Sequence, residues 1–576
     1  MEAVGAAIDA EHEEGNDVRP RLAFTHDDLV KEVRGTLWVL MGAVSFVLLV
    51  AIANVAGLAL ARGAARRKEM AVRAALGAGK ARLIGQVFVE SSLVALLGGA
   101  FGVLLALWGV DLLGSLRPDA LPTEAVIAID WRVLAFTLGI SVGAGLLFGL
   151  LPALQAARSN DLAGTLKDAD LRTTGGLGRS RARGALIVAE VALSLVLLVG
   201  AGLSIRGFIS LSRLDPGFRS DGIATMSLFL RSSETREPAA QRAYIAQLAE
   251  AVRAVPGVAM ATLSAGIPLG GSSETSFGID GAPEPKLGEH PMAVYYLTDG
   301  EFQKTLGLHL LAGRYLSASD TSDRPLVAVV DEVLAKTYFP DGALGKRILW
   351  EGNPAEIVGV VAHVAHYGPG RPEAAVNQFY VPVAQVPDDM VTFYLRGVDV
   401  TVLAAPGVSA ASLPQAVATA IAAVDRDLAV DQPHTMEQLL GDSLAARRFA
   451  MMLLGLFAGV ALVLAVVGLY SVLSFLVTQR RHEIGVRMAL GARPGTVERL
   501  VVLQGLKLAG LGLALGVIAS LALHEVLASL VEGVQATDPL TFAAVGGVLG
   551  LAALLASWLP ARRAARVDPM IALRSE

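Results

Sequence analysis

The segment TLWVLMGAVSFVLLVAIANVAGLALA, Thr36–Ala61, contains no charged side chain. A helix crosses the ~30 Å hydrocarbon layer of a membrane with about 20 apolar residues, so this segment predicts a transmembrane helix. Six further segments are long and apolar enough: Ser91–Val110, Val133–Ala157, Gly184–Ile205, Phe449–Gln479, Leu500–Leu523 and Pro539–Ala561. A buried core helix could explain one such run, but not seven. The sequence therefore predicts a polytopic α-helical membrane protein with about seven transmembrane helices.

Basic residues orient these helices. The loop Ala61–Arg82 holds seven Lys and Arg and one acid, and Arg158–Arg183, Gln479–Arg499 and the C-terminal tail are also basic. Because cytoplasmic loops are enriched in Lys and Arg, we expect a multi-pass protein of a bacterial inner membrane. Its N-terminus then lies outside, its C-terminus lies in the cytoplasm, and the polar segment Arg206–Arg448 lies outside the membrane.

Two of the basic loops repeat one another. ARRKEMAVRAALGA at Ala65–Ala78 matches QRRHEIGVRMALGA at Gln479–Ala492, and each matched pair lies 414 residues apart. Farther along, LPALQAAR at Leu151–Arg158 matches LPARRAAR at Leu559–Arg566. A unit of three helices and one cytoplasmic loop therefore occurs twice.

The repeat divides the chain. We assign residues 36–158 and 447–576 to two three-helix units, 159–183 to a cytoplasmic linker, 184–206 to a helix that opens the second unit, and 207–446 to an external domain. Residues 1–35 are polar, without the apolar core of a signal peptide. We interpret them as the remnant of a first external domain and expect an N-terminally incomplete duplication.

The external segment predicts an α/β fold. Two strand–helix–strand sets are expected from alternating and amphipathic patterns, at Gly222–Leu230, Ala239–Val255 and Val258–Ser264, and at Val391–Gly397, Leu413–Val424 and Asp427–Val430. Strand-like segments between the sets are Pro325–Glu332, Lys346–Trp350 and Ala355–Val364. We therefore expect a large α/β extracytoplasmic domain that contains a split β-α-β domain and a β-rich insert.

Composition excludes several kinds of site. The chain has no cysteine, and its net charge of −5 argues against a nucleic-acid surface. It contains no G-x-x-x-x-G-K-[ST] phosphate loop, because the nearest match has Ala74 in place of the first glycine and Ala81 in place of the hydroxyl. We expect no enzyme activity and no cofactor in this chain, with any ATP bound by a partner subunit.

Several motifs resemble those of MacB/FtsX-type ABC permeases. They are the repeated RRxEIxVRxALGA loop, the LPAxxAAR and DPMxALR ending, LSRLDPGF at Leu211–Phe218, FQKTLGLHLLAGR at Phe302–Arg314 and VAVVDEVLAKTYFPDGALGKRI at Val327–Ile348. The tandem three-helix plan is similar to the duplicated orphan permeases of that family. The resemblance implies an exporter subunit that passes the motion of a separate ATPase to an extracytoplasmic domain.

The resemblance also implies that both repeated loops contact the ATPase. A short helix could bury its apolar positions in a groove of the ATPase while its arginines serve as polar anchors. Basic charge alone would also fix topology, but topology does not explain a repeated ALGA at one spacing. The candidate coupling residues are Arg66, Arg67, Glu69, Arg73, Leu76 and Gly77 in the first copy, and Arg480, Arg481, Glu483, Arg487, Leu490 and Gly491 in the second.

Four other residues are weaker candidates. Glu90 and Glu190 lie near helix ends, where a polar interface contact is favoured over a proton relay. His363 and His366 follow a predicted strand without a neighbouring cluster of carboxylates or thiols, so a surface turn is favoured over a metal pair. The sequence indicates no metal site and no catalytic residue.

Two classes of function remain open at this point. The first is a permease of an ABC exporter that moves peptides, antibiotics or lipoproteins with an ATPase in trans and a periplasmic adaptor as a further partner, working as a homodimer or as a pseudo-dimer of its two units. The second is a non-transporting membrane regulator or scaffold that acts on extracytoplasmic partners. A truncated, inactive fragment is a third reading of the incomplete repeat.

Overall fold

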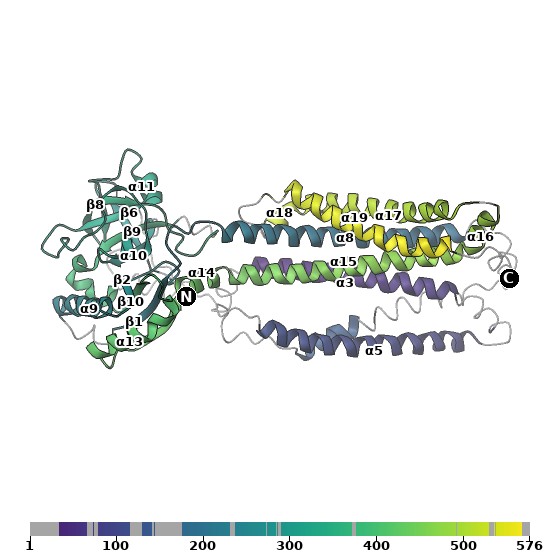
Figure 1. The fold of residues 1–576 in the computed structure, drawn as a ribbon, viewed down its shortest axis with the longest axis horizontal. Helices are drawn as coiled ribbons and strands as arrows, with labels where there is room; N and C mark the ends of the chain where they lie inside the picture. Colours follow the sequence, from purple (N-terminus) through teal and green to yellow (C-terminus); the bar gives the residue numbers. More distant parts are fainter. Residues whose placement is uncertain are drawn as a thin grey trace, which may run out of the picture. The chain divides into compact units, whose positions relative to one another are not determined.

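A computed structural model describes residues 34–65, 73, 79–115, 130–140, 143, 175–230, 237–271, 273–283, 285, 290–370, 376–490, 492–528, 535 and 537–566. The described chain divides into two compact units (Figure 1). An α/β unit comprises residues 211–446, and a helical unit comprises the described residues of 26–210 and 447–576.

The helical unit consists mainly of long apolar helices. Six of the described helices are long and apolar enough to cross a membrane: α3 (Arg34–Ala65), α5 (Lys80–Ser115), α8 (Gly175–Ser212), α15 (Ala445–Gln479), α17 (Pro494–Ala522) and α19 (Pro539–Ala565). The shorter elements are α16 (Arg481–Ala489), α18 (His524–Ala528) and a helix at Trp131–Ile140. The prediction of several membrane-spanning helices is confirmed. Most of the predicted span Val133–Ala157 lies outside the described residues.

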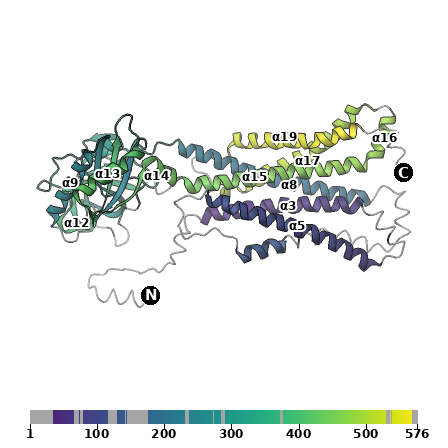
Figure 2. The same cartoon turned by 60° about the horizontal axis from the view of Figure 1, so that its bottom comes forward.

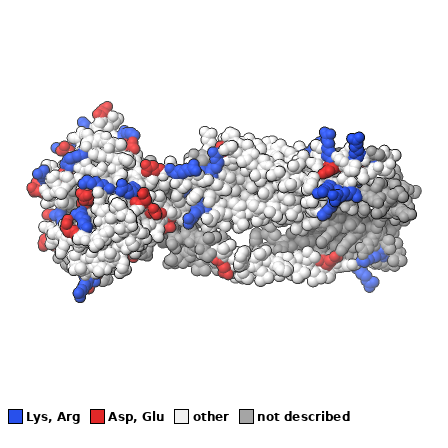
Figure 3. Space-filling view, viewed as in Figure 1, with Lys and Arg blue, Asp and Glu red and all other residues white. Residues whose placement is uncertain are grey.

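Most charged side chains lie toward the ends of the described helices, although Lys507 is exposed near the middle of α17. Figure 3 shows Lys and Arg gathered at the end of the helical unit that carries α16, whereas the middle of the helices is almost free of charge on this face. Such a band is what a ~30 Å hydrocarbon layer requires, because a charged side chain at its centre is costly.

Small residues allow the helices of this unit to approach closely. The buried side of α17 repeats small residues at Gly505, Ala509, Gly512 and Gly516. A Cβ added at Gly512 would lie 2.6 Å from Val191 Cβ of α8, and one added at Gly516 would lie 2.9 Å from Leu195 Cβ of the same helix. In lipid, helices gain no hydrophobic stabilisation by packing together, so they are held by van der Waals contacts. Small residues at this spacing allow the close approach that such contacts need.

The α/β unit contains a four-stranded sheet with the order β11-β1-β10-β2. Its strands are β1 (Ile223–Phe229), β2 (Val258–Ser264), β10 (Gly397–Ala404) and β11 (Val430–Thr435), and its helices are α9 (Pro238–Arg253) and α13 (Leu413–Val424). All neighbouring strands are antiparallel. Consequently β1 and β2 are parallel with β10 between them, and β10 and β11 are parallel with β1 between them, which is a split β-α-β topology.

The segment between β2 and β10 forms a seven-stranded sheet with the order β5-β8-β6-β9-β4-β3-β7. Its strands are β3 (Glu274–Ile279), β4 (Met292–Thr298), β5 (Leu310–Gly313), β6 (Val327–Asp331), β7 (Arg347–Trp350), β8 (Asn353–Val361) and β9 (Asn377–Pro382). Strand β7 also pairs with β8, so the sheet curls back on itself. The helices α10 (Phe302–Leu306), α11 (Glu332–Tyr338), α12 (Val391–Tyr394) and α14 (Met436–Ser443) complete the unit.

One strand prediction is wrong. Residues Val391–Gly397 do not form a strand, because α12 covers Val391–Tyr394 and β10 begins only at Gly397. Val391 and Tyr394 are buried at the i, i+3 spacing of a helix, whereas Val398, Val400 and Val402 alternate into the core as strand residues do. The last strand is also later than predicted, at Val430–Thr435 instead of Asp427–Val430.

We expect Gly512→Ala to lower the melting temperature of the detergent-solubilised protein, because the added Cβ overlaps Val191 of α8 and overpacking costs about 1–3 kcal/mol. Gly510→Ala is the matched control, since a Cβ there meets nothing within 4 Å. Equal melting temperatures for the two variants would show that α17 does not approach α8 closely.

Candidate functional site

The second repeated loop folds into α16, a short helix between two long ones. The loop begins where α15 ends at Gln479, and α17 begins at Pro494, where a proline fits because the first turn of a helix needs no backbone donor. The Ile484 amide donates to the Arg480 carbonyl at 2.9 Å, and the Leu490 amide donates to the Val486 carbonyl at 3.0 Å. Helical i→i−4 hydrogen bonds therefore extend to both ends of α16.

An apolar face fixes α16 to the bundle. Ile484 is buried, and it packs in one cluster with Val497 and Val501 of α17 and with Ala561 and Ala564 of α19. Met488, one helical turn later, packs against the same cluster. The i, i+4 spacing of Ile484 and Met488 places both on one side of the helix. This contact joins α16 to the ends of α17 and α19.

The residues of α16 that do not face the bundle, together with Leu490 after it, are either charged or exposed to solvent. Arg487 donates to Glu483 at 2.6 Å across one helical turn, and both side chains are about half exposed. Such a surface pair is worth only about 0.3–0.5 kcal/mol, so it contributes little to stability. Leu490 is 83% exposed, directly after the helix. A large apolar side chain at the tip of a basic turn is suited to insertion into another protein.

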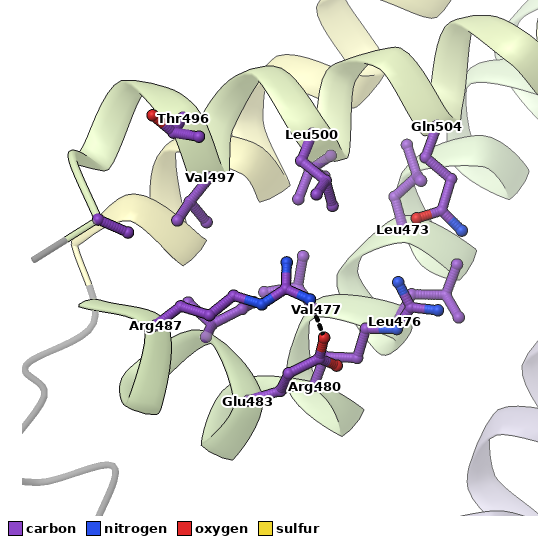
Figure 4. A pocket seen from close by; sticks show the side chains of 13 residues that line it. Leu473, Leu476, Val477, Arg480, Glu483, Arg487, Thr496, Val497, Leu500 and Gln504 are labelled. Carbon is purple, nitrogen blue, oxygen red and sulfur yellow. Dashed lines mark hydrogen bonds and ion pairs between the residues drawn. The ribbon is translucent and has the colours of Figure 1, made fainter. Parts of the chain in front are cut away.

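A small cavity lies between α16, α15 and α17 (Figure 4). Its volume is about 130 Å³, whereas pockets for small molecules measure ~300–1,000 Å³. It therefore has room for a protein side chain rather than for a nucleotide. The lining residues labelled in Figure 4 are Leu473, Leu476, Val477, Arg480, Glu483, Arg487, Thr496, Val497, Leu500 and Gln504.

The first copy differs chemically from the second. Arg73 donates to Gln86 of α5 at 2.7 Å. The residue of the second copy that aligns with Gln86 is Leu500, which cannot accept a hydrogen bond, and there Arg487 pairs with Glu483 instead. At two further cavity positions, Arg62 and Glu90 of the first copy align with Leu476 and Gln504 of the second.

The structure places half of the predicted coupling residues. Arg480 lies in the turn before α16; Arg481, Glu483 and Arg487 lie within the helix; and Leu490 follows it. Arg73 lies before α5 in the first copy. The other predicted residues lie outside the described part of the chain: Arg66, Arg67, Glu69, Leu76, Gly77 and Gly491.

The sequence analysis missed the partners of α16 on neighbouring helices. Val497 and Val501 of α17 and Ala561 and Ala564 of α19 form the support of Ile484. The i, i+4 spacing of Val497 and Val501 predicts a buried side of α17, but apolar residues occur all around a membrane helix and conceal such a pattern. Their role depends on which helices meet.

The weaker candidates lie in different settings. Glu190 is buried in α8, and Glu90 lies exposed in α5. The predicted surface turn is wrong for His366, which is buried in the α/β unit. Its ring bonds Tyr296 at 2.7 Å and the Gly271 carbonyl at 2.6 Å, and burial lowers its pKa. His363 bonds Asp331 at 2.6 Å. Among the described residues, no three His, Cys, Asp or Glu side chains gather as metal ligands would.

Comparison with known proteins relates both units to one family. The model of the FtsX-like permease C-terminal domain matches residues 41–160 and again 455–569. The model of the MacB-like periplasmic core domain matches residues 134–420. The chain belongs to the FtsX/MacB-type ABC permeases. This permease is therefore a multi-pass protein of the inner membrane with a large extracytoplasmic domain.

The names of two relatives combine ATP-binding and permease functions. It is 27% identical over 273 residues to the macrolide export ATP-binding/permease protein MacB of Azoarcus sp. (strain BH72), a match that covers 46% of this chain and 40% of that relative. It is 26% identical over 275 residues to the protein of the same name from Mannheimia succiniciproducens, covering 47% and 41%. The matched region therefore spans less than half the length of these curated relatives.

A solved structure was also compared with the permease. The periplasmic region of MacB from Actinobacillus actinomycetemcomitans has 14% sequence identity and a TM-score of 0.27, and the match covers 40% of this chain and 94% of that one.

We expect Ile484→Ala to release α16 from α17 and α19, since truncating a buried isoleucine costs about 2–5 kcal/mol. Limited trypsin digestion of the solubilised protein should then cut faster after Arg481 and Arg487. Leu490→Ala serves as control, because that side chain is already exposed and should leave cleavage unchanged. Equal cleavage in Ile484→Ala would mean that the apolar face does not hold α16.

Proposed function

We propose that this chain is the permease of an ABC-type exporter and that α16 receives the motion of an ATP-binding subunit supplied by another polypeptide. The observation that carries the proposal is the exposed Leu490 at the tip of an element that is firmly packed on three long helices. A large apolar side chain at the tip of a basic turn is suited to serve as the buried anchor of a contact with another protein.

The contact chemistry follows from the two faces of α16. Leu490 enters an apolar groove of the ATPase as the buried anchor, while the Glu483–Arg487 pair forms part of a polar rim that aligns the subunits. The cavity of about 130 Å³ beside α16 accepts one side chain of the ATPase in return. The loop around Arg73, Leu76 and Gly77 has the same role in the first unit.

Movement at α16 passes into α15, to which the chain joins it, and from α15 into α8, which packs against α15. Helix α15 has 35 residues and α8 has 38, so at 1.5 Å per residue they measure about 52 and 57 Å. Both exceed the ~30 Å hydrocarbon layer, and each continues in the chain directly into the α/β unit. We propose that α15 and α8 move as rigid helices and so transmit motion from the cytoplasmic end to the extracytoplasmic domain.

The remaining assignments complete this proposal. The end that carries α16 and its basic residues faces the cytoplasm, which places the C-terminus there and the N-terminus outside. ATP binds to the ATP-binding subunit, since residues 1–576 contain no phosphate loop. The extracytoplasmic domain acts on its cargo, which belongs to the peptides, antibiotics or lipoproteins handled by the family, with a periplasmic adaptor as a further partner.

The proposal is tested by purifying the tagged permease from its host membrane and identifying ATPases that remain bound. We expect Leu490→Asp to reduce the recovered ATPase at least tenfold, since burying an unpaired carboxylate in an apolar contact costs several kcal/mol. Combining it with Leu76→Asp should abolish recovery.

Two control variants separate docking from folding. Leu490→Met keeps an apolar side chain of similar size and should retain the ATPase. Leu311→Asp puts the same charge on an exposed leucine of the α/β unit and should also retain it. If the wild-type permease is folded and recovers no ABC ATPase, the proposed function is wrong and a regulator or scaffold takes its place.

A further inference from the structure

One side of α3 is buried at regular intervals. Leu40 and Val47 are half-buried, and Ala43, Val50 and Asn54 are buried. These positions alternate three and four residues apart, which is the spacing of the contact positions in a coiled coil. Residues on the opposite side of the helix, such as Met41 and Val44, are exposed. These five positions of α3 therefore form one continuous contact face.

The residues that meet this face are the repeat equivalents of its own residues. Adding the repeat distance of 414 to the five positions gives Leu454, Phe457, Ala461, Leu464 and Gly468 of α15. Leu40, Ala43 and Val47 pack in one cluster with Leu454, Phe457 and Ala461. Two helices meet at equal register only when they run parallel and are related by a local twofold axis. Figures 1 and 2 both show α3 alongside α15.

Polar side chains close one end of this contact. The Asn54 side chain donates to the Leu464 carbonyl of α15 at 2.9 Å. A Cβ added to Gly468 would lie 2.7 Å from Asn54 Oδ1 and would overlap the Glu190 carboxylate of α8. One turn away, the Ser194 hydroxyl of α8 donates to the Ala461 carbonyl at 3.1 Å. Helix α8 thus covers the seam between α3 and α15.

The residues at the polar end are not interchangeable between the copies. Asn54 needs the space that Gly468 leaves, and Gly468 is the position that aligns with Asn54. Two first copies would place Asn54 against Asn54, and two second copies would place Gly468 against Gly468 beside a buried Glu190 without the asparagine. A single buried asparagine at such a contact position is a known means of selecting register and partner.

We propose that α3 pairs with α15 of the same chain and that Asn54, Gly468 and Glu190 select this pairing, so that one chain forms the paired membrane unit by itself. The partner of the first three-helix unit is thus the second unit and not a second copy of the protein. This proposal does not rest on ATPase coupling, because it concerns contacts inside the membrane unit.

Cysteine cross-linking tests the pairing directly, since the natural chain contains no cysteine. Val47→Cys/Ala461→Cys places two thiols at equivalent positions of the seam. On oxidation in membranes we expect a disulfide within one chain, detected by mass spectrometry as a linked peptide pair in protein that migrates as a monomer. Val44→Cys/Val463→Cys, on exposed sides of the same helices, should not cross-link.

Co-expression distinguishes one chain from two. A chain carrying only Val47→Cys is combined with a differently tagged chain carrying only Ala461→Cys. We expect no disulfide-linked dimer. A linked dimer, or a dimer formed by either single-cysteine chain alone, would show that copies of the protein exchange or self-pair these helices, and it would overturn the proposal.

The selecting role of Gly468 is tested in the same double-cysteine chain. Gly468→Ala should lower the yield of the internal disulfide several-fold, because its methyl group displaces Asn54 and Glu190. Gly459→Ala is the matched control on the same helix, where a Cβ meets nothing within 4 Å, and it should leave the yield unchanged. An unchanged yield with Gly468→Ala would show that the space at Gly468 is not needed for the pairing.

Asn54→Ala is a second test that adds no volume. It removes the bond to the Leu464 carbonyl and should also lower the yield. If both Gly468→Ala and Asn54→Ala cross-link as the parent does, the selection by these residues is refuted.

Discussion

The membrane unit depends on the close approach of α8 to its neighbours. Among the six candidate spans that the structure describes, α8 has 61% of its apolar window buried, whereas the others have between 0% and 33%. Backbone polar groups are satisfied within each helix in lipid, so helices are held together mainly by close packing and by a few side-chain bonds. Gly512 and Gly516 of α17 and Gly468 of α15 provide the space for α8.

This packing supports the proposed transfer of motion from α16 to the long helices. Helix α16 contributes little stability of its own, because its ion pair is exposed and its buried contact is limited mainly to Ile484 and Met488. That contact nevertheless connects it with α17 and α19, which pack closely against each other, and the chain connects it with α15. Because packed interiors are nearly incompressible, a displacement of α16 shifts these helices together.

Sequence alone could predict the parts of this structure that depend on local properties. Length and hydropathy located the membrane helices, and Val258–Ser264 and Leu413–Val424 coincide with β2 and α13. The prediction for Val391–Gly397 failed because burial against other elements, not alternation, decides between helix and strand in so short a segment. The repeat distance identified the two repeated loops, but the residues on α17 and α19 that support α16 follow only from which helices meet.

The same limit applies to the seam between α3 and α15, where the decisive residues are inconspicuous in sequence. Asn54 is one polar residue in an apolar run, and Gly468 is one of 61 glycines in the chain. The contact between Asn54 and Gly468 becomes evident only when both residues are placed at equal register on facing helices. At the axis of a homodimer a residue must face its own copy, whereas a duplicated chain can place different residues there. Duplication therefore permits an asymmetric contact, Asn54 against Gly468, that symmetry forbids, and it equally permits the two repeated loops to differ, as they do at Gln86 and Leu500.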